Sequence, residues 1–415
     1  MPETTEAADR RAHRAFRFLF LGIGTWSAAV GPFSSVMLRS HGVDTATIGL
    51  LSAFGAVAAT VLVPIWGHVA DVLAGRAKAF RVGLALAFVA AVALLLPLPL
   101  QVFALVLASF AVFPSVFAAL GDALAVGGLR APERQYGALR ARASLSFGAG
   151  AIVAGFLYNE AGYAAVPLVS IVWSGALFYI LGRVPDTTRS AGVRALAAVH
   201  GGAEAAGRFG SISRAVSVQP RLWAVLAVFT LAYAGIMGAG TFVGIRIVEL
   251  GGQPSDVALT FGISSFAEIP GLVLAAWIGR RIGIRWLVCL ALVGYGLCVV
   301  SWGILPSPIT INATRIATGL TFGTLIAARV LVIARLLPTE LQATGQTMLQ
   351  AATFGLGTAL GSIVGGALYG AIGPMGFFVV AGGLCIGGGI GAWIVLYGPV
   401  GEPTRAVERV EIAVE

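Results

Sequence analysis

The sequence contains few charged residues. Only 11% of its 415 residues are Asp, Glu, Lys or Arg, whereas 58% are hydrophobic. A soluble domain usually carries about 25% charged residues, so this composition excludes an ordinary water-soluble protein. It indicates that most of the chain lies within a lipid bilayer.

Lysine, histidine and cysteine are also scarce, which excludes several kinds of site. Lys78 is the single lysine and no Gly-Lys-Ser/Thr sequence occurs, so a phosphate-binding loop for ATP is excluded. The four histidines and three cysteines show no pair at metal-ligand spacing. No nucleophile and base stand in a catalytic pattern either. We therefore expect no metal, no cofactor and no enzymatic activity.

Long hydrophobic runs, in contrast, fill most of the chain. A membrane-spanning helix needs roughly 20 apolar residues, and a helix satisfies its own backbone groups in lipid. The sequence therefore predicts an all-α membrane protein with twelve transmembrane helices. We place them at residues 16–38, 46–70, 80–97, 99–127, 137–160, 163–183, 221–247, 255–279, 286–305, 309–336, 345–370 and 375–398.

The basic residues predict how these helices are oriented. The net charge of +9 is not gathered in one patch, so we expect no nucleic-acid partner. The basic residues fall instead at alternate loops, which is typical of cytoplasmic helix ends. We therefore predict a multi-pass protein of a bacterial inner membrane with both termini in the cytoplasm. The residues that carry this prediction are Arg10, Arg11, Arg14, Arg17, Arg76, Lys78, Arg81, Arg130, Arg134, Arg280, Arg281 and Arg285.

A polar stretch divides the chain into two halves. It is predicted as a cytoplasmic linker over residues 184–220, between six-helix bundles at 1–183 and 221–415. Parallel repeats place equivalent helices in two related bundles. Such a repeat is present, because Phe147-Gly148-x-Gly150 in the fifth span recurs as Phe354-Gly355-x-Gly357 in the eleventh.

Glu268 is a carboxylate inside a predicted span, near the middle of the uncharged stretch between Asp256 and Arg280. A charge at the bilayer centre costs about 2.5–3.5 kcal/mol on insertion scales, and such residues usually handle a proton, an ion or a polar solute. We therefore expect Glu268 to bind substrate or to carry a proton. A purely structural role is the alternative.

The hairpin between the fourth and fifth spans also carries charges. Asp122 lies about six residues before the turn and Arg140 about four after it, so the two lie at similar depth and could pair. Ser144 and Phe147 follow Arg140 on one helical face. A carboxylate, a guanidinium and an aromatic ring together suit a polar or anionic ring compound. The alternative is a pair that only locks the hairpin.

The loop after the second span contains Gly67, Asp71, Arg76 and Lys78, and this pattern resembles the gating loop of the major facilitator superfamily. An Asp near helix ends and a set of cations can hold one side of a carrier closed. Val72 stands where the family usually has an arginine, and a loop that only orients the helices is the alternative. The resemblance implies a gating loop formed by Gly67, Asp71, Arg76 and Lys78.

The hairpin, together with Ala267-Glu268-Ile269-Pro270 in the eighth span, is similar to the branch of phenylpropionate permeases, nucleoside–proton symporters and lactose permease. The resemblance implies that Asp122, Arg140, Phe147 and Glu268 bind substrate. Lactose permease couples protons through a His and a Glu in its tenth helix, but this chain has Thr318 and Thr321 there. Proton coupling would then fall to Glu268 or Asp122.

Arg329 lies deep in the tenth span, which is unusual for that branch. It is a candidate charge of the central cavity, where it would compensate Glu268 or contact an anionic substrate. The alternative is a side chain that extends along the helix to the cytoplasmic interface.

These features predict a monomeric secondary transporter that works by alternating access. Its partners would be a small-molecule substrate, protons and the lipid bilayer. We expect proton-coupled uptake of an aromatic acid, a nucleoside or a sugar. Two alternatives stay open: a proton-coupled efflux antiporter, and a non-transporting sensor or assembly factor of the same fold.

Overall fold

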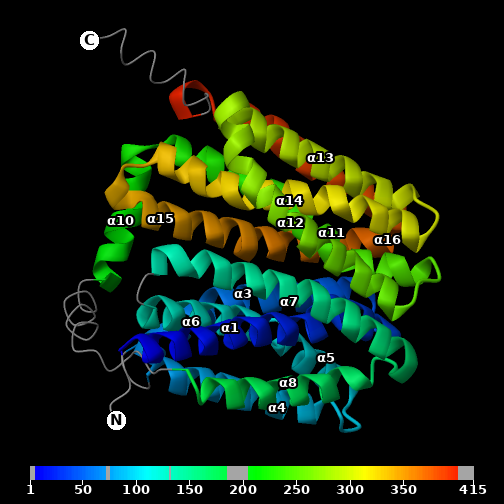
Figure 1. Ribbon diagram of the computed structural model, residues 1–415. Coiled ribbons are helices and arrows are strands. Elements are labelled where there is room, and N and C mark those ends of the chain that lie inside the picture. The colour runs from blue at the N-terminus through cyan, green and yellow to red at the C-terminus, as the bar shows by residue number, and fades with distance from the viewer. Residues whose placement is uncertain (1–4, 72–74, 130–131, 185–203, 401–415) are drawn as a thin grey trace, which may run out of the picture. The chain divides into compact units, whose positions relative to one another are not determined.

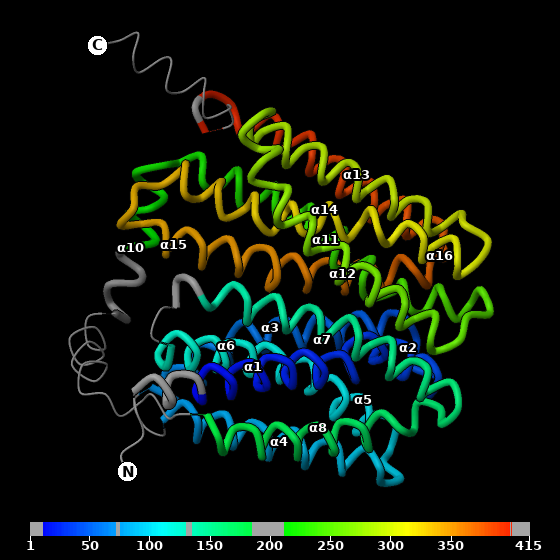
Figure 2. The backbone as a smooth tube through the Cα atoms, in the orientation of Figure 1, coloured from blue at the N-terminus to red at the C-terminus, as the bar shows by residue number. Residues whose placement is uncertain are grey.

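The computed structural model describes residues 5–71, 75–129, 132–184 and 204–400, and every regular element in these ranges is a helix (Figure 1). Followed from blue to red, the described parts of the chain form a succession of helices, most of them long (Figure 2). The prediction of an all-α protein is therefore confirmed.

Proline interrupts two of the first six spans. Pro32 lies in a short 3-10 turn because proline fixes φ and lacks the N–H that a continuous helix needs. Pro114 lies in the first turn of its helix, where a missing N–H is tolerated. The elements of these spans are α1 (Thr5–Val30), η1 (Gly31–Phe33), α2 (Ser34–Ser40), α3 (Thr45–Val69), α4 (Arg76–Ala93), α5 (Leu100–Ser109), α6 (Phe113–Gly128), α7 (Pro132–Ala161) and α8 (Ala165–Leu181).

Gly373 has φ +71°, a conformation that favours glycine, and it separates the last two spans at the boundary that the sequence predicts. Two features of the second half go beyond the sequence prediction. A π-helical segment, η4 (Ala351–Gly357), interrupts the eleventh span. The predicted linker contains a helix, α10 (Glu204–Val218). The remaining elements are α11 (Arg221–Glu249), α12 (Pro254–Ile282), α13 (Ile284–Ile304), α14 (Pro308–Leu336), α15 (Thr339–Gln350), α16 (Thr358–Val395) and η5 (Gly398–Val400).

All twelve predicted spans coincide with helices. Among the described residues, nine helical segments are long and apolar enough to cross a membrane, with α15 to α16 counted as one. That segment contains two spans because it breaks at Gly373. The remaining two spans are α8, a shorter apolar helix, and α4, which has three basic residues near its start.

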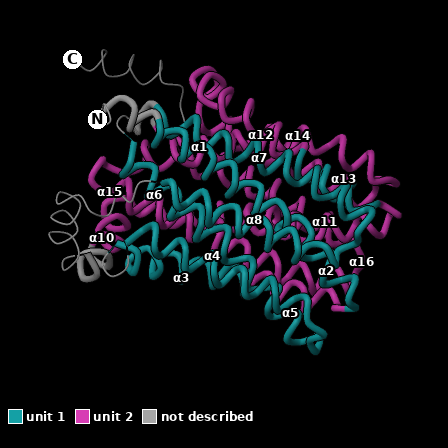
Figure 3. The backbone as a smooth tube through the Cα atoms, turned by 60° about the horizontal axis from the view of Figure 1, so that its bottom comes forward, with its two compact units in different colours: residues 1–42, 54–203, 253–262 teal, residues 43–53, 204–252, 263–415 magenta. Residues whose placement is uncertain are grey.

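The chain forms two compact units, which Figure 3 shows in different colours. The start of α3 belongs to the unit that holds most of the second half, and the start of α12 belongs to the other. The predicted division at residues 184–220 stays a prediction. Unit 1 comprises residues 1–42, 54–203 and 253–262, and unit 2 comprises residues 43–53, 204–252 and 263–415.

Aromatic side chains form much of the core of unit 1. Trp26 on α1 donates a hydrogen bond from Nε1 to the Ser174 hydroxyl on α8 at 2.9 Å. Its ring meets Phe117 of α6 edge to face, with centroids 5.0 Å apart, and Phe117 stacks on Phe80 of α4 at 5.0 Å. Such pairs stabilise beyond the area they bury, so they hold four helices of the unit together.

Glycine lets the helices of unit 2 approach closely. A Cβ added to Gly361 of α16 would lie within 3 Å of three backbone atoms of Ala234 on α11. Gly296 of α13 and Gly382 of α16 face each other in the same way. Small residues at helix crossings are the usual means of association in membranes, and this accounts for part of the high glycine content.

Candidate functional site

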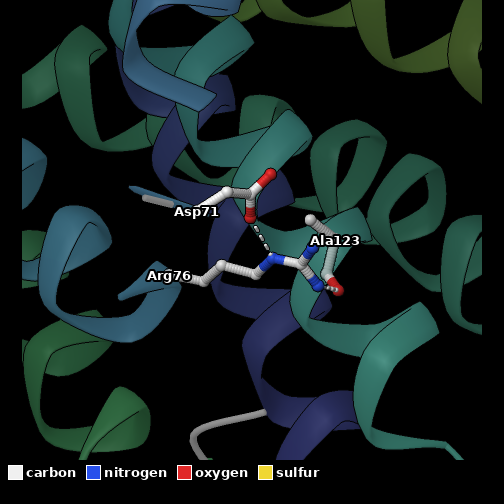
Figure 4. A network of polar contacts seen from close by, with 3 residues as sticks. All are labelled: Asp71, Arg76 and Ala123. Atoms are coloured by element: carbon white, nitrogen blue, oxygen red, sulfur yellow. Dashed lines mark hydrogen bonds and ion pairs between the residues drawn. The ribbon is translucent and has the colours of Figure 1, made fainter. Parts of the chain in front are cut away.

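The loop after α3 is tied to α6 by Arg76 (Figure 4). Arg76 donates hydrogen bonds from Nε to Asp71 Oδ1 at 2.6 Å and from Nη1 to the Ala123 carbonyl at 2.9 Å. The Arg76 side chain is 16% exposed and the Asp71 side chain 44%, so solvent reaches the carboxylate and the pair contributes on the scale of exposed pairs, about 0–1 kcal/mol. Gly67 lines a cavity of about 50 Å³ beside the network, whereas Lys78 is exposed. The structure thus brings Asp71 and Arg76 together, and their gating role stays a prediction.

Asp122 on α6 and Arg140 on α7 form a loose ion pair in unit 1. Arg140 Nη1 lies 4.0 Å from Asp122 Oδ1, which is too long for a hydrogen bond. Oδ1 is buried and has no hydrogen-bond partner among the described residues. The Arg140 side chain is 53% exposed. Both groups therefore keep capacity for a further partner, although their role in substrate binding stays a prediction.

The same face of α7 carries further polar and aromatic groups. Ser144 and Phe147 are both half-buried, one and two turns beyond Arg140. Tyr136 lies one turn before Arg140, where its hydroxyl is close enough to interact with both Asp122 and Arg140. Tyr136 was missed by sequence reasoning, although its spacing of four residues from Arg140 would have placed it on this face.

Glu268 lies on α12 in unit 2, held in place by glycines of α14. A Cβ added to Gly319 or Gly323 would lie within 3 Å of backbone atoms of Ser264 and Glu268, respectively. Because the two backbones nearly touch, α12 is held against α14 at the level of Glu268. The Glu268 side chain is half-buried. Asp122 and Arg140 belong to unit 1, whereas Glu268 belongs to unit 2.

Arg329 takes part in an aromatic cluster of unit 2. Its guanidinium carbon lies 4.9 Å from the ring centre of Phe354, which belongs to the π-helical η4. Phe354 meets Tyr233 of α11 at 5.3 Å. Arg329 and Glu268 both act electrostatically on the Tyr233 hydroxyl. The cluster therefore brings the two predicted charges into one neighbourhood, while the proposed exposure of Arg329 to a cavity stays a prediction.

Three members of this region were missed by sequence reasoning. Arg315 on α14 is 5% exposed and lies 4.9 Å from the ring centre of Trp302. As a charged residue inside a span it carried a signal in the sequence. The other two members are Tyr233 and Tyr295, and nothing in the sequence pointed to either. The ring centre of each lies 6.4 Å from that of Phe322.

A second polar contact in unit 1 joins α7 to the start of α12. Asn159 Nδ2 donates to the Ser255 hydroxyl at 2.9 Å, and the Ser255 N–H donates to Asn159 Oδ1 at 2.9 Å. Gly155, one turn earlier, lets the backbones meet, since an added Cβ would collide with Ala258. This reciprocal pair lies at the opposite end of α7 from Arg140.

Apolar helices that carry charged residues in their interiors are typical of membrane proteins that handle ions or polar solutes. The model of the MFS_1 like family matches residues 14–380. The chain therefore belongs to this family, and the predicted membership of the major facilitator superfamily is confirmed.

Named relatives cover nearly the whole chain. Maltose permease of Geobacillus stearothermophilus is 24% identical over 367 residues, which is 87% of this chain and 88% of the permease. The uncharacterized transporter YwbF of Bacillus subtilis (strain 168) is 22% identical over 389 residues, 91% of this chain and 92% of YwbF.

Solved structures share the fold. The nucleoside transporter NupG superposes with a TM-score of 0.69 at 13% identity, over 94% of this chain and 99% of NupG. A D-xylose-proton symporter superposes with a TM-score of 0.65 at 14% identity, over 93% and 97% of the two chains. The predicted twelve-helix major facilitator fold is therefore confirmed.

Proposed function

We propose that this transporter takes up a small organic solute together with protons by alternating access. The observation that carries the proposal is the presence of a carboxylate within a membrane-spanning helix of each unit, Asp122 and Glu268. Carboxylates in this position are costly and usually mark proton or substrate pathways. Asp122 is held only loosely by Arg140, at 4.0 Å, so a proton or a ligand can compete for it.

The proton would be carried by Glu268 or Asp122. Helix α14 has Thr318 and Thr321 where the lactose permease pattern has titratable groups. A threonine hydroxyl does not titrate near neutral pH, and that of Thr321 donates to carbonyl groups of its own helix. Glu268 is the better candidate of the two carboxylates, because it lies at the middle of α12 whereas Asp122 lies nearer the end of α6.

The substrate would be a ring compound with hydroxyl or acid groups. Arg140, Ser144 and Phe147 present a guanidinium, a hydroxyl and an aromatic ring along one face of α7, with Tyr136 beside them. Sugars, nucleosides and aromatic acids all fit this chemistry. A sugar is the first class to test because maltose permease is a relative over most of the chain.

One polar contact is suited to act as a latch during alternating access. The reciprocal Asn159–Ser255 hydrogen bonds would close the extracellular side, whereas the Asp71–Arg76 network lies within the first predicted bundle and would hold the loop after α3 in place. This assignment rests on the orientation that the basic residues predict, with both termini in the cytoplasm of a bacterium. We propose that a single chain suffices, since both units of the carrier are present in it.

Transport by purified protein in proteoliposomes tests the proposal. Radiolabelled maltose, uridine and phenylpropionate are offered with an inward proton gradient, and an entrapped pH dye reports proton entry. We expect one solute to accumulate, protons to enter with it, and a protonophore to abolish accumulation. Accumulation driven only by an outward gradient would instead support the efflux antiporter. Absence of flux for every solute, equal to that of protein-free liposomes, would support the non-transporting alternative.

A further inference from the structure

The turn between α12 and α13 concentrates three arginines, Arg280, Arg281 and Arg285, within six residues. Gly283 forms the turn with φ +83°, so α12 ends at Ile282 and α13 begins at Ile284. Both helices are long and apolar enough to span a membrane, which places the turn at a membrane surface. None of the three guanidinium groups pairs with a carboxylate in the part of the chain that the structure describes.

Two of these arginines are held on tryptophan rings. The guanidinium carbon of Arg281 lies 4.0 Å from the ring centre of Trp277, one turn earlier on α12. That of Arg285 lies 3.7 Å from the ring centre of Trp393, and its Nε donates a hydrogen bond to the Trp393 carbonyl. Stacking fixes the plane of a guanidinium and leaves N–H groups on its edge available. Arg281 and Arg285 are therefore oriented before any ligand arrives.

Exposed indoles surround the arginines. Trp277 and Trp286 are each 47% exposed, and Trp286 meets Trp393 at 5.7 Å with the rings inclined at 61°. Tryptophan is enriched where a membrane meets water because its ring is apolar and its N–H is polar. The cationic turn thus lies beside apolar surface that suits the glycerol and upper acyl region of a lipid.

We propose that Arg280, Arg281 and Arg285, with Trp277 and Trp286, form a binding site for the headgroup of an anionic phospholipid. The guanidinium group matches phosphate oxygens in a bidentate manner, and clusters of basic residues next to spanning helices attract anionic lipids. A free phosphate ion would gain nothing from the exposed indoles, which favours the lipid. This site is independent of the solute-binding residues described above.

Other helix ends provide matched controls. Arg183 lies over the ring of Tyr179, and Arg221 lies over the ring of Tyr397. In both pairs the distance from the guanidinium carbon to the ring centre is 3.7 Å. These are single arginines on tyrosine rings, without further cations within the next few residues of their helices. If stacking on an aromatic ring were enough to bind the lipid, they would bind it equally.

The test measures lipid binding to the full-length protein in detergent by native mass spectrometry. Phosphatidylglycerol and phosphatidylcholine with the same acyl chains are titrated separately. We expect wild type to prefer phosphatidylglycerol. We also expect the double variant Arg280→Gln, Arg281→Gln to lose about fivefold in phosphatidylglycerol affinity for each arginine. Arg183→Gln should behave as wild type. The Arg280 side chain is exposed and makes no hydrogen bond, ion pair or ring contact with other described residues, so we expect Arg280→Gln alone to leave folding undisturbed.

Three results would overturn the proposal. Wild type could bind the two lipids equally, or the double variant could keep the full preference for phosphatidylglycerol. Inorganic phosphate could also displace phosphatidylglycerol where sodium chloride of equal ionic strength does not, which would identify a site for free anions. Persistence of lipid binding in the presence of phosphate, together with its loss in the double variant, supports the lipid site.

Discussion

Replacement of Gly323 by alanine should displace the helix that carries Glu268. A Cβ on Gly323 would lie at 3.0 Å or less from three backbone atoms of α12, the carbonyl O and C of Glu268 and the N of Leu272. Backbone atoms cannot rotate away, so α12 and α14 would have to separate. Overpacking of this kind costs about 1–3 kcal/mol, which exceeds the roughly 1 kcal/mol that alanine gains over glycine within a helix. We therefore expect a less stable protein and slower transport.

Thermal unfolding of the purified protein in detergent measures this effect, with Gly383→Ala as the matched control. Gly383 lies on α16, and a Cβ added there has no neighbour within 4 Å among the described residues. The control should melt at the wild-type temperature or above it, because only the gain in helix propensity remains. Equal melting temperatures for Gly323→Ala, Gly383→Ala and wild type would show that α12 and α14 are not packed through Gly323.

Three further predictions concern other residues. Arg140→Lys keeps the charge but loses the bidentate group, so calorimetry should show weaker solute binding; unchanged affinity with a lower melting temperature would indicate a pair that only locks the hairpin. Arg329→Cys, in a chain without its native cysteines, should react with a water-soluble thiol reagent and be protected by solute; a cysteine that never reacts would place the residue against lipid or packed helix. Asp44→Ala should cost about 1 kcal/mol at neutral pH, because Asp44 accepts hydrogen bonds from the hydroxyl and N–H of Thr47 at 2.7 and 2.9 Å. These bonds lower the pKa of the Asp44 carboxyl, so its contribution is complete above the ordinary pKa of about 3.9 and is lost as the pH falls through the lowered value; a difference in melting temperature that persists at lower pH would contradict this.

The helices could be predicted because lipid imposes a simple rule on the sequence. Long apolar runs located all twelve spans, and alternating basic residues gave an expected orientation. The π-helical η4 depends on local backbone geometry, which apolar composition does not encode. Helix α10 lies in a polar stretch where the hydrophobic pattern gives no signal.

Residues of the candidate site could be predicted only where a charged residue lay inside a span or where spacing along a helix placed residues at the same depth or on the same face. Asp122 and Arg140 come within 4.0 Å because the hairpin places them at equal depth. Tyr233 and the π-helical Phe354 reach the neighbourhood of Arg329 through packing between different helices, which a single sequence does not reveal. The contact of Gly323 with the backbone of α12 appears only in the structure.

The central claim, that Glu268 couples solute uptake to protons, is tested most directly by Glu268→Gln in proteoliposomes. The substitution removes a titratable group with little change in shape. With an inward proton gradient at neutral pH, wild type and the control Glu340→Gln, whose carboxyl is exposed at the start of α15, should accumulate the transported solute. Glu268→Gln should only equilibrate it down its concentration gradient. Accumulation by Glu268→Gln equal to wild type would contradict the account and remove this residue from the proton pathway.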